Sequence, residues 1–204
     1  MRDEALDITV NPGVYPPSED TYLLLKAIAL RPRDSFLEVG CGTGLIALNA
    51  AKVTRLVVGS DVSFAAVRNT VQNAESNGLE GACSVVQSNL LTSIHPFARF
   101  SALAFNPPYL PDDDNRTDLD HALVGGTVGT ELAMRFLDQA ARHVLPSGSI
   151  YVVVSTLGDV KQVRNAMEGY GMTVSDNFRQ HLFFEEIHVL RGVMPPQRKQ
   201  FYEQ

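Results

Sequence analysis

The chain has 204 residues, of which 45% are hydrophobic and 20% are charged, and its formal net charge is −6 at pH 7. This composition excludes a disordered chain, and no apolar run comes near the roughly 18 residues that a membrane span needs. The acidic balance also argues against a nucleic-acid partner, because proteins that bind nucleic acids usually carry a basic face.

Helices and strands are expected to alternate along the chain. A helix is predicted over residues 18–30, with Ser18 as N-cap, Glu19 and Asp20 at the positive end of the helix dipole, and Pro32 ending it. The elements that follow are a strand at 35–39, a helix at 45–53, a strand at 56–60, a helix at 64–77, strands at 83–86 and 102–105, a helix at 131–144, a turn at 146–148, a strand at 150–154, a helix at 159–167, and strands at 172–174 and 186–190.

This alternation indicates an α/β fold, in which a mostly parallel sheet carries helices on both faces. No helix is expected between the last two strands, so the final strand is predicted to run antiparallel to the others. We expect a single domain over residues 1–204, with an N-terminal helical extension at 1–34 and a flexible tail at 194–204. In open α/β sheets, ligands bind beyond the carboxyl ends of the strands. The loops at those ends are therefore the expected place of a functional site.

The sequence indicates neither a targeting signal nor a metal site. The chain opens with Met1-Arg2-Asp3-Glu4, which lacks the basic and then apolar pattern of a secretory signal. Two cysteines, Cys41 and Cys83, are too few for a zinc quartet or a disulfide scaffold. The acidic run at 112–114 is interpreted as a solvated loop rather than a metal site. We therefore expect a cytoplasmic protein without a metal site.

One loop at the carboxyl edge, residues 38–44, joins the first strand to the next helix and contains Gly40, Gly42 and Gly44. Glycines at alternate positions allow a tight turn and a close approach of the backbone to a ligand. The spacing differs from the G-x-G-x-x-G of dinucleotide-binding loops, and no basic residue lies nearby to meet a pyrophosphate. A tight turn without a ligand is the alternative interpretation.

Two carboxylates flank this loop. Asp61 ends the second strand, where its side chain can accept hydrogen bonds from a ribose diol, while Ser63 can cap the next helix in its place. The alternative is that Asp61 itself is the N-cap. Glu38 adds a negative charge that suits a cationic cofactor better than a polyphosphate. S-adenosylmethionine, which has a ribose, a sulfonium and an ammonium group, fits all of these features.

A second loop on the same edge, directly after the fourth strand, contains Asn106-Pro107-Pro108-Tyr109. Two prolines can simply end a strand. The order of the four residues instead favours methyl transfer to a planar nitrogen. The Asn106 side-chain oxygen and a backbone carbonyl can accept the two N–H groups of an amide or amino group, on a backbone that the prolines stiffen. Tyr109 offers a flat face to the acceptor, so Asn106, Pro107 and Tyr109 are the candidate catalytic residues and Pro108 is a further substrate contact.

With these motifs the chain resembles the HemK/PrmC protein-glutamine methyltransferases, and most of all the short archaeal and eukaryotic branch that modifies class I translation release factors. The resemblance runs from Val14-Tyr15-Pro16-Pro17-Ser18-Glu19-Asp20-Thr21 through the glycine-rich loop, Asp61 and the Asn-Pro-Pro-Tyr motif to residues 122–129. It implies a seven-stranded class I methyltransferase fold, which is Rossmann-like, and S-adenosylmethionine as cofactor. It further implies the side-chain amide of Gln in a Gly-Gly-Gln loop as acceptor, and a small zinc-binding activator subunit as partner.

The resemblance also implies roles for individual residues. The expected cofactor contacts are Thr21 at the methionine carboxylate, Gly40 at the amino group, Asp61 with Val62 at the ribose, Asn89 with Leu90 at the adenine, and Glu38, Gly42, Gly44 and Asn106 around them. Tyr15 is expected to contact the substrate. Asn89 stands where the family usually has Asp, which predicts a weaker or altered adenine contact. Only 34 residues precede the first strand, so the helical domain of bacterial members is not expected, and release-factor docking must depend on the edge loops or a partner.

Other functions stay open on the sequence. They are an adenine-N6 or guanine-N2 methyltransferase acting on DNA or RNA, a protein lysine methyltransferase, and a non-catalytic subunit that binds S-adenosylmethionine. The nucleic-acid enzymes usually need a basic surface or a recognition region, and the catalytic fold takes up almost all of this chain. A non-catalytic subunit needs neither Asp61 nor the Asn-Pro-Pro-Tyr motif. The loop at 110–128 is long enough to act as a lid, and His121 within it could touch the substrate.

Overall fold

A computed structural model describes residue 1 and residues 5–108, 130–182 and 184–197 of the chain. Tyr109, His121, the predicted lid at 110–128 and the acidic run at 112–114 lie outside the described residues, as does most of the predicted tail. Within the described part, no helix is long and apolar enough to cross a membrane.

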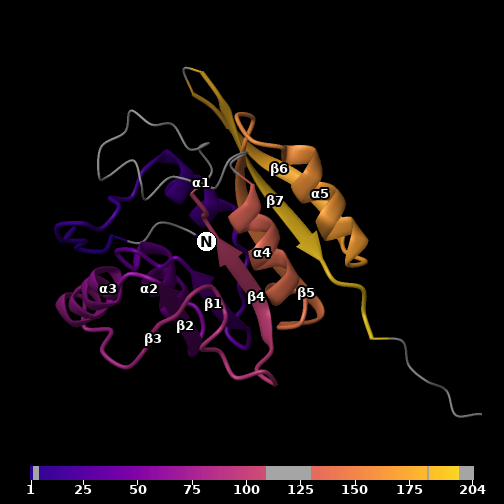
Figure 1. Ribbon diagram of the computed structural model, residues 1–204. Helices are drawn as coiled ribbons and strands as arrows, with labels where there is room; N and C mark the ends of the chain where they lie inside the picture. The colour runs from indigo at the N-terminus through magenta and orange to yellow at the C-terminus, as the bar shows by residue number, and fades with distance from the viewer. Residues whose placement is uncertain (2–4, 109–129, 183, 198–204) are drawn as a thin grey trace, which may run out of the picture.

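A single twisted sheet of seven strands forms the centre of the described structure (Figure 1). Its order is β3-β2-β1-β4-β5-β7-β6, and the first five strands in this order are parallel. The last strand along the chain, β7, runs antiparallel to both of its neighbours, which confirms the predicted arrangement. The strands are β1 (Ser35–Val39), β2 (Leu56–Asp61), β3 (Ser84–Gln87), β4 (Phe100–Phe105), β5 (Val144–Ser155), β6 (Thr173–His181) and β7 (Glu186–Val193).

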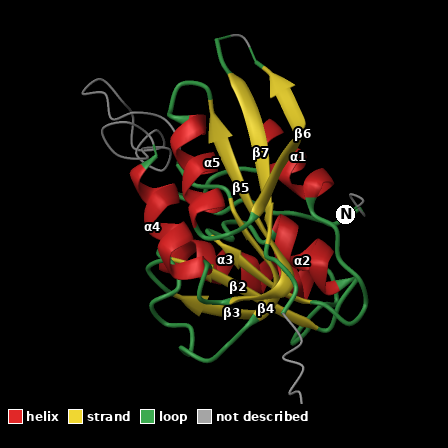
Figure 2. Cartoon of the chain, turned by 90° about the vertical axis from the view of Figure 1, so that its right-hand side faces the viewer, coloured by secondary structure: helices red, strands yellow, loops and turns green. Residues whose placement is uncertain are grey.

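Helices cover both faces of the sheet, as the α/β prediction requires. Figure 2 shows α4 and α5 on one side of the sheet and α1 and α2 on the other. The helix α3 packs against β2 and β3 at the other end of the sheet from α5, which packs against β5, β6 and β7. The helices are α1 (Glu19–Ala27), α2 (Leu45–Ala51), α3 (Phe64–Ser76), α4 (Glu131–Ala140) and α5 (Val160–Gly169).

Two hydrophobic cores lie on the two faces of the sheet, because alternate residues of each strand point to opposite sides. On β1, Phe36 joins the core formed with α1 and α2, whereas Leu37 joins the core formed with α4 and α5. On β5, Tyr151 joins the core formed with α1 and α2, and Ile150 joins the core formed with α4 and α5. A strand that is buried on both faces has hydrophobic residues throughout, which explains the continuous apolar runs in the sequence. The sheet is therefore held rigidly from both sides, and its carboxyl edge is a firm support for loops.

The structure corrects several predicted boundaries. The first helix, predicted over 18–30 with Pro32 ending it, spans Glu19–Ala27, because the backbone is already extended at Ile28. The helix predicted over 131–144 ends at Ala140, and Val144 instead begins β5, where it pairs with Phe100 of β4. Residues 146–148, predicted as a turn, lie inside β5, next to an irregularity in its pairing with β4. Val144 extends the apolar pattern of the helix, but residues 141–143 form a turn, and Val144 then pairs with β4 instead. β6 is also longer than the predicted 172–174, because its pairing with β7 continues to His181.

Candidate active site

Loops at the carboxyl ends of β1, β2 and β4 surround one pocket with a volume of about 400 Å³. This volume lies in the range of sites for small ligands and cofactors, about 300–1,000 Å³. Twelve of the residues predicted from the sequence line it: Tyr15, Thr21, Glu38, Gly40, Gly42, Asp61, Val62, Asn89, Leu90, Asn106, Pro107 and Pro108. Segments that are far apart in the sequence, with both predicted motifs, therefore meet at one site.

The glycine-rich loop needs its glycines for two different reasons. Gly40 has φ +69°, and a Cβ there would lie 3.3 Å from the Phe105 ring, so the backbone passes close to the end of β4. Gly44 is the N-cap of α2 with φ +86°, and a Cβ there would lie only 2.7 Å from Thr70 Cγ2. Both conformations are in the left-handed region, which strongly favours glycine. Gly44 thus allows α2 to pack closely on α3, behind the pocket wall, and its predicted cofactor contact stays a prediction.

Asp61 holds the glycine-rich loop in place. Its Oδ2 accepts the backbone N–H of Gly42 at 3.0 Å, and its Oδ1 accepts the N–H of Ser63 at 2.9 Å. Ser63 is the N-cap of α3, as expected, and its side chain accepts the N–H of Ala66. Burial raises the pKa of Asp61, although the backbone hydrogen bonds counteract this effect. The sequence analysis left Asp61 free for a ligand. In the structure it already accepts two N–H groups, and its carboxylate has further lone pairs and belongs to the pocket lining.

Glu38 is almost completely buried beneath the same loop. Its Oε2 accepts the backbone N–H of Ala47 in the first turn of α2 at 2.8 Å. Burial raises the pKa of Glu38 well above its ordinary value, the Ala47 hydrogen bond lowers it, and the nearby charge of Asp61 raises it further. A positive group in the pocket would stabilise the ionised carboxylate. Burial thus destabilises the ionised forms of two carboxyl groups of the site, Glu38 and Asp61, and a bound cation would stabilise them.

Asn106, directly after β4, is oriented by a carboxylate from α1. Its Nδ2 donates to Asp20 Oδ2 at 2.9 Å, although the two residues are 86 positions apart. The other end of the amide, Oδ1, is shielded from solvent and has no hydrogen-bond partner among the described residues. Asn106 as a residue is part of the pocket lining. A buried acceptor without a partner costs about 1–3 kcal/mol, so it is typical of a position that a ligand completes. The arrangement leaves a fixed acceptor for an N–H group.

Three asparagines, two on α3 and one at its C-cap, hold the N-terminal segment beside the pocket. Asn69, Asn73 and Asn77 follow each other at intervals of four residues, which rise about 6 Å along a helix. Alternate residues of the segment 7–11 bind them, and two residues of extended chain span about 6.6 Å. The spacing of the asparagines along the helix therefore matches the spacing of alternate residues along the extended segment. Each asparagine amide can accept one backbone N–H of the segment as a result. Asn73 Nδ2 also donates to Thr43 O of the glycine-rich loop at 2.9 Å, so this ladder joins the segment to the loop.

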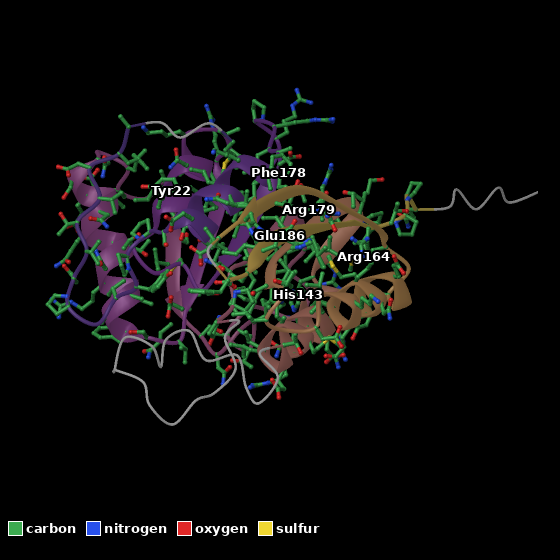
Figure 3. The ribbon with its side chains drawn as sticks, turned by 90° about the horizontal axis from the view of Figure 1, so that it is seen from above. Tyr22, His143, Arg164, Phe178, Arg179 and Glu186 are labelled. Atoms are coloured by element: carbon green, nitrogen blue, oxygen red, sulfur yellow. The ribbon has the colours of Figure 1, made fainter. Side chains whose placement is uncertain are left out.

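A second polar cluster lies outside the pocket, between α5, β6 and β7. Asp176 accepts hydrogen bonds from Arg164 at 2.9 Å and from Arg179 at 2.6 Å, and His188 Nδ1 lies 3.4 Å from it. Figure 3 shows Arg164, Arg179 and Glu186 together over this half of the sheet. Burial raises the pKa of Asp176, but the hydrogen bonds and charges of Arg179 and His188 outweigh it and lower the pKa. These bonds connect one helix with the two last strands, so we interpret the cluster as a stabilising network.

Metal chemistry finds no support in the described part of the chain, where no group of three His, Cys, Asp or Glu side chains could hold an ion. Cys41 and Cys83 are buried, and burial raises the pKa of both thiols, that of Cys83 to about 12. A thiol with a raised pKa is a poor nucleophile at neutral pH. The polar groups at the pocket are therefore carboxylates, hydroxyl groups, backbone groups and the amides of Asn89 and Asn106.

Comparisons with known proteins identify the family. The family model described as "Methyltransferase small domain" matches residues 5–179 of the chain. A Methanocaldococcus jannaschii protein, named as a candidate protein N5-glutamine methyltransferase, is 32% identical over 193 residues, which cover 93% of this chain and 96% of that protein. The chain belongs to the HemK family of protein-glutamine methyltransferases.

Other relatives agree with membership of the HemK family. Mouse methyltransferase HEMK2 is 27% identical over 191 residues, which cover 87% of this chain and 88% of that protein. The E. cuniculi Mtq2–Trm112 complex, described as responsible for the methylation of the translation termination factor eRF1, contains a chain with 26% identity and a TM-score of 0.68; the match covers 89% of this chain and 99% of that one. A methyltransferase from Pyrococcus furiosus, 22% identical with a TM-score of 0.69 over 93% of this chain and 89% of that one, shows the same fold. The protein is therefore an enzyme that transfers methyl groups, with the class I methyltransferase fold.

Two features of this HemK-family site were missed by the sequence analysis. Asp20 was assigned to the helix dipole, yet it is 1% exposed and binds Asn106. The spacing of Asn69, Asn73 and Asn77 was not interpreted at all, although polar amides four residues apart on one face of a helix could have indicated a partner there. For Asp20, the sequence carries no comparable local signal, because its partner comes from a distant loop.

The asparagine ladder leads to a prediction about methyl-donor binding. Replacing Asn73 by alanine removes two partly buried hydrogen bonds to the N-terminal segment and a buried one to Thr43. We expect the free energy of unfolding to fall by about 2–3 kcal/mol, since each such bond contributes about 1 kcal/mol, and the affinity for the methyl donor to fall as well. Urea unfolding and donor titration measure the two effects.

The matched control is Asn77→Ala, which removes similar bonds to the segment but none to the glycine-rich loop. These bonds are exposed to solvent, so we expect a smaller loss of stability and unchanged donor affinity. Equal donor affinity in the Asn73→Ala variant and the wild type would contradict a role of the ladder in shaping the pocket.

Proposed function

We propose that this enzyme uses S-adenosylmethionine to methylate the N5 nitrogen of a glutamine side chain in the Gly-Gly-Gln motif of a translation release factor. The observation that carries the proposal is the amide of Asn106, a residue of the pocket lining, whose Oδ1 is a buried acceptor without a partner in the described structure. An acceptor of this kind suits an N–H group of a planar amide. Its position beside the glycine-rich loop brings such a nitrogen next to a methyl donor.

The chemistry of the pocket supports S-adenosylmethionine as the donor. Asp61 has lone pairs to accept the ribose hydroxyls, and Asn89 and Leu90 line the part of the pocket assigned to the adenine. Thr21 and Gly40 line the part assigned to the methionine end. Glu38 supplies the negative charge for a cation. The pocket has no Arg or Lys among its described lining residues, which favours this cation over a polyphosphate.

In the proposed reaction, the residues of the site position two bound reactants rather than exchange protons with them. Asn106 Oδ1 accepts one N–H of the glutamine amide, and a backbone carbonyl within Asn106–Pro107 accepts the other. Both bonds hold the nitrogen lone pair toward the methyl group. The new N–C bond forms as the S–C bond breaks, the thioether leaves, and the nitrogen loses a proton once it has become cationic. Such positioning can lower a barrier by roughly 7–11 kcal/mol.

Glu38 makes donor binding depend on pH. The ordinary pKa of a glutamate is near 4.5, and burial places that of Glu38 well above this value. A bound sulfonium favours the ionised carboxylate, so the donor binds more tightly as the pH rises from that ordinary value toward the raised pKa. The slope is at most about tenfold per pH unit, because one proton is exchanged. Above the raised pKa, the affinity becomes constant.

Calorimetric titration of S-adenosylmethionine in two buffers of different ionisation enthalpy measures this proton release. The Glu38→Gln variant keeps the shape of the side chain and removes the proton of Glu38, so its donor affinity should change less with pH than that of the wild type, with Asp61 responsible for the remaining dependence. An identical pH profile for the wild type and Glu38→Gln would show that Glu38 does not respond to the charge of the donor.

The relatives support a release factor as the acceptor. The M. jannaschii protein is named for protein N5-glutamine methylation, and the Mtq2–Trm112 complex is described as acting on eRF1. The formal net charge of −6 gives no support to the nucleic-acid alternative. By the same similarity to the Mtq2 chain, we propose that a small zinc-binding activator subunit assembles with this protein.

The test is incubation with labelled S-adenosylmethionine, with and without the activator subunit, and three acceptors: a class I release factor, its Gln→Ala variant in the Gly-Gly-Gln motif, and duplex DNA. We expect label only on the unchanged release factor, at the glutamine when the product is mapped by mass spectrometry. Label on DNA alone, or on a lysine of the release factor, would replace the proposed acceptor by one of the alternatives.

A further inference from the structure

Asp20 is buried at the start of α1. It is the second residue of the helix and 1% exposed. Its Oδ1 accepts the backbone N–H of Thr21 at 2.6 Å and the Thr21 hydroxyl at 3.1 Å. Its Oδ2 accepts the Asn106 amide at 2.9 Å. The two oxygens of this carboxylate therefore have different partners, one local and one from the catalytic loop.

The carboxylate of Asp20 fixes the orientation of the Asn106 amide. An ionised carboxylate can only accept hydrogen bonds, so the NH2 end of Asn106 must point toward Asp20. The oxygen end then faces away from Asp20 and is the buried acceptor described above, in a residue that lines the pocket. With the opposite orientation, two oxygens would face each other at Asp20, and an NH2 group would face the N–H groups of the incoming amide.

We propose that Asp20 is a positioning residue that fixes the orientation of the Asn106 amide and so keeps its oxygen available to the methyl acceptor. The inference rests on the proposed role of Asn106 in holding an N–H group. Asp20 does not touch the reacting atoms. It acts through Asn106, and it links α1 to the loop after β4.

In the variant Asp20→Asn, we expect the Asn106 amide to turn over. The Thr21 N–H is a fixed backbone donor, so the oxygen of the new side chain must face it, and the new NH2 group must face Asn106. Asn106 then turns its oxygen toward this NH2 and presents its own NH2 to the pocket. We expect kcat to fall by about 100-fold, the size of effect that follows the loss of one preorganised polar contact at a reacting group. The affinity for S-adenosylmethionine should stay unchanged.

Exchanging the side chains of Asp20 and Asn106 in a double variant is expected to restore an acceptor for the N–H group of the substrate. In the single variant Asn106→Asp, two carboxylates face each other, so one must be protonated or displaced and kcat falls. In the double variant Asp20→Asn with Asn106→Asp, the new amide again faces Thr21 with its oxygen and donates its NH2 to the new carboxylate. The second carboxylate oxygen points into the pocket as an acceptor. We expect kcat at least about tenfold above either single variant, as for strongly coupled partners in one hydrogen-bond network.

The experiment measures kcat, donor affinity and thermal unfolding for the wild type, the two single variants and the double variant. Glu19→Gln is the matched control, because it removes a carboxylate from the adjacent position of the same helix, where the side chain is exposed and bonded to Ser18. We expect Glu19→Gln to keep the activity of the wild type. Full activity of Asp20→Asn would overturn the proposal, and so would a folded, donor-binding double variant no more active than either single variant.

A readout without turnover separates this inference from the proposed function. In ¹⁵N-labelled protein, the side-chain NH2 of Asn106 should exchange slowly with solvent, because it is bonded to Asp20, and exchange should become fast in Asp20→Asn. If the wild type fails to methylate a release factor but shows this protection, the proposed acceptor is wrong and the orientation by Asp20 stands. If the NH2 exchanges equally fast in both proteins, Asp20 does not orient the amide, whatever the acceptor is.

Discussion

Replacing Asn106 by alanine is expected to abolish methyl transfer while leaving the affinity for S-adenosylmethionine nearly intact. The variant removes the acceptor that holds the N–H of the substrate, and with it the orientation of a weakly nucleophilic nitrogen. Loss of one preorganised contact at a reacting group reduces kcat by about 10²–10³-fold, and lost alignment adds to this. Single-turnover methylation measures the loss, and calorimetric titration measures donor binding.

The alanine variant also leaves Asp20 without its bond from Asn106. A buried polar group that loses a partner costs about 1–3 kcal/mol, so some loss of thermal stability is expected and must be measured alongside activity. If donor affinity disappeared together with activity in a folded variant, Asn106 would be a donor-binding residue and its catalytic role would be wrong.

Asp61→Ala is expected to have its main effect on donor affinity. The variant removes the acceptor for the ribose and, at the same time, the bond from Gly42 that holds the glycine-rich loop. Hydrogen bonds to a charged group contribute about 1.5–3 kcal/mol, so we expect the dissociation constant to rise by about 100-fold. At saturating donor, kcat should fall much less than in the Asn106→Ala variant. Donor titration and steady-state kinetics measure the two values.

A matched control separates ligand binding from a general loss of stability. Asp159 is the N-cap of α5, where its carboxylate accepts the backbone N–H of Gln162 at 2.9 Å, outside the pocket. Asp159→Ala should lower stability by about 1 kcal/mol, as other lost N-caps do, without changing donor affinity. If Asp159→Ala and Asp61→Ala weakened donor binding equally, the effect of Asp61 would come from stability alone.

Much of the fold could be predicted because local patterns carry it. Apolar runs such as that of β5 identify buried strands, and Ser63 and Asp159 cap the helices that follow them. The two site loops were also predictable, because parallel strands bring their carboxyl ends to one edge. Boundaries were less predictable where two patterns overlap. Val144 continues a helical run in the sequence, yet it pairs with Phe100 in the sheet.

The orientation of groups within the site depended on contacts between distant residues. Asp20 and Asn106 lie 86 positions apart, and the bond between the N–H of Thr9 and Asn73 spans 64. The bond between Asp20 and Asn106 has no periodic pattern in the sequence. The asparagines of the ladder are regularly spaced, but this spacing does not say which segment of the chain packs against them. The sequence by itself therefore determined the α/β class, the carboxyl-edge site and the residue types of its chemistry. Only the tertiary structure decided which end of the Asn106 amide faces the pocket, because that choice is made by a carboxylate on another helix.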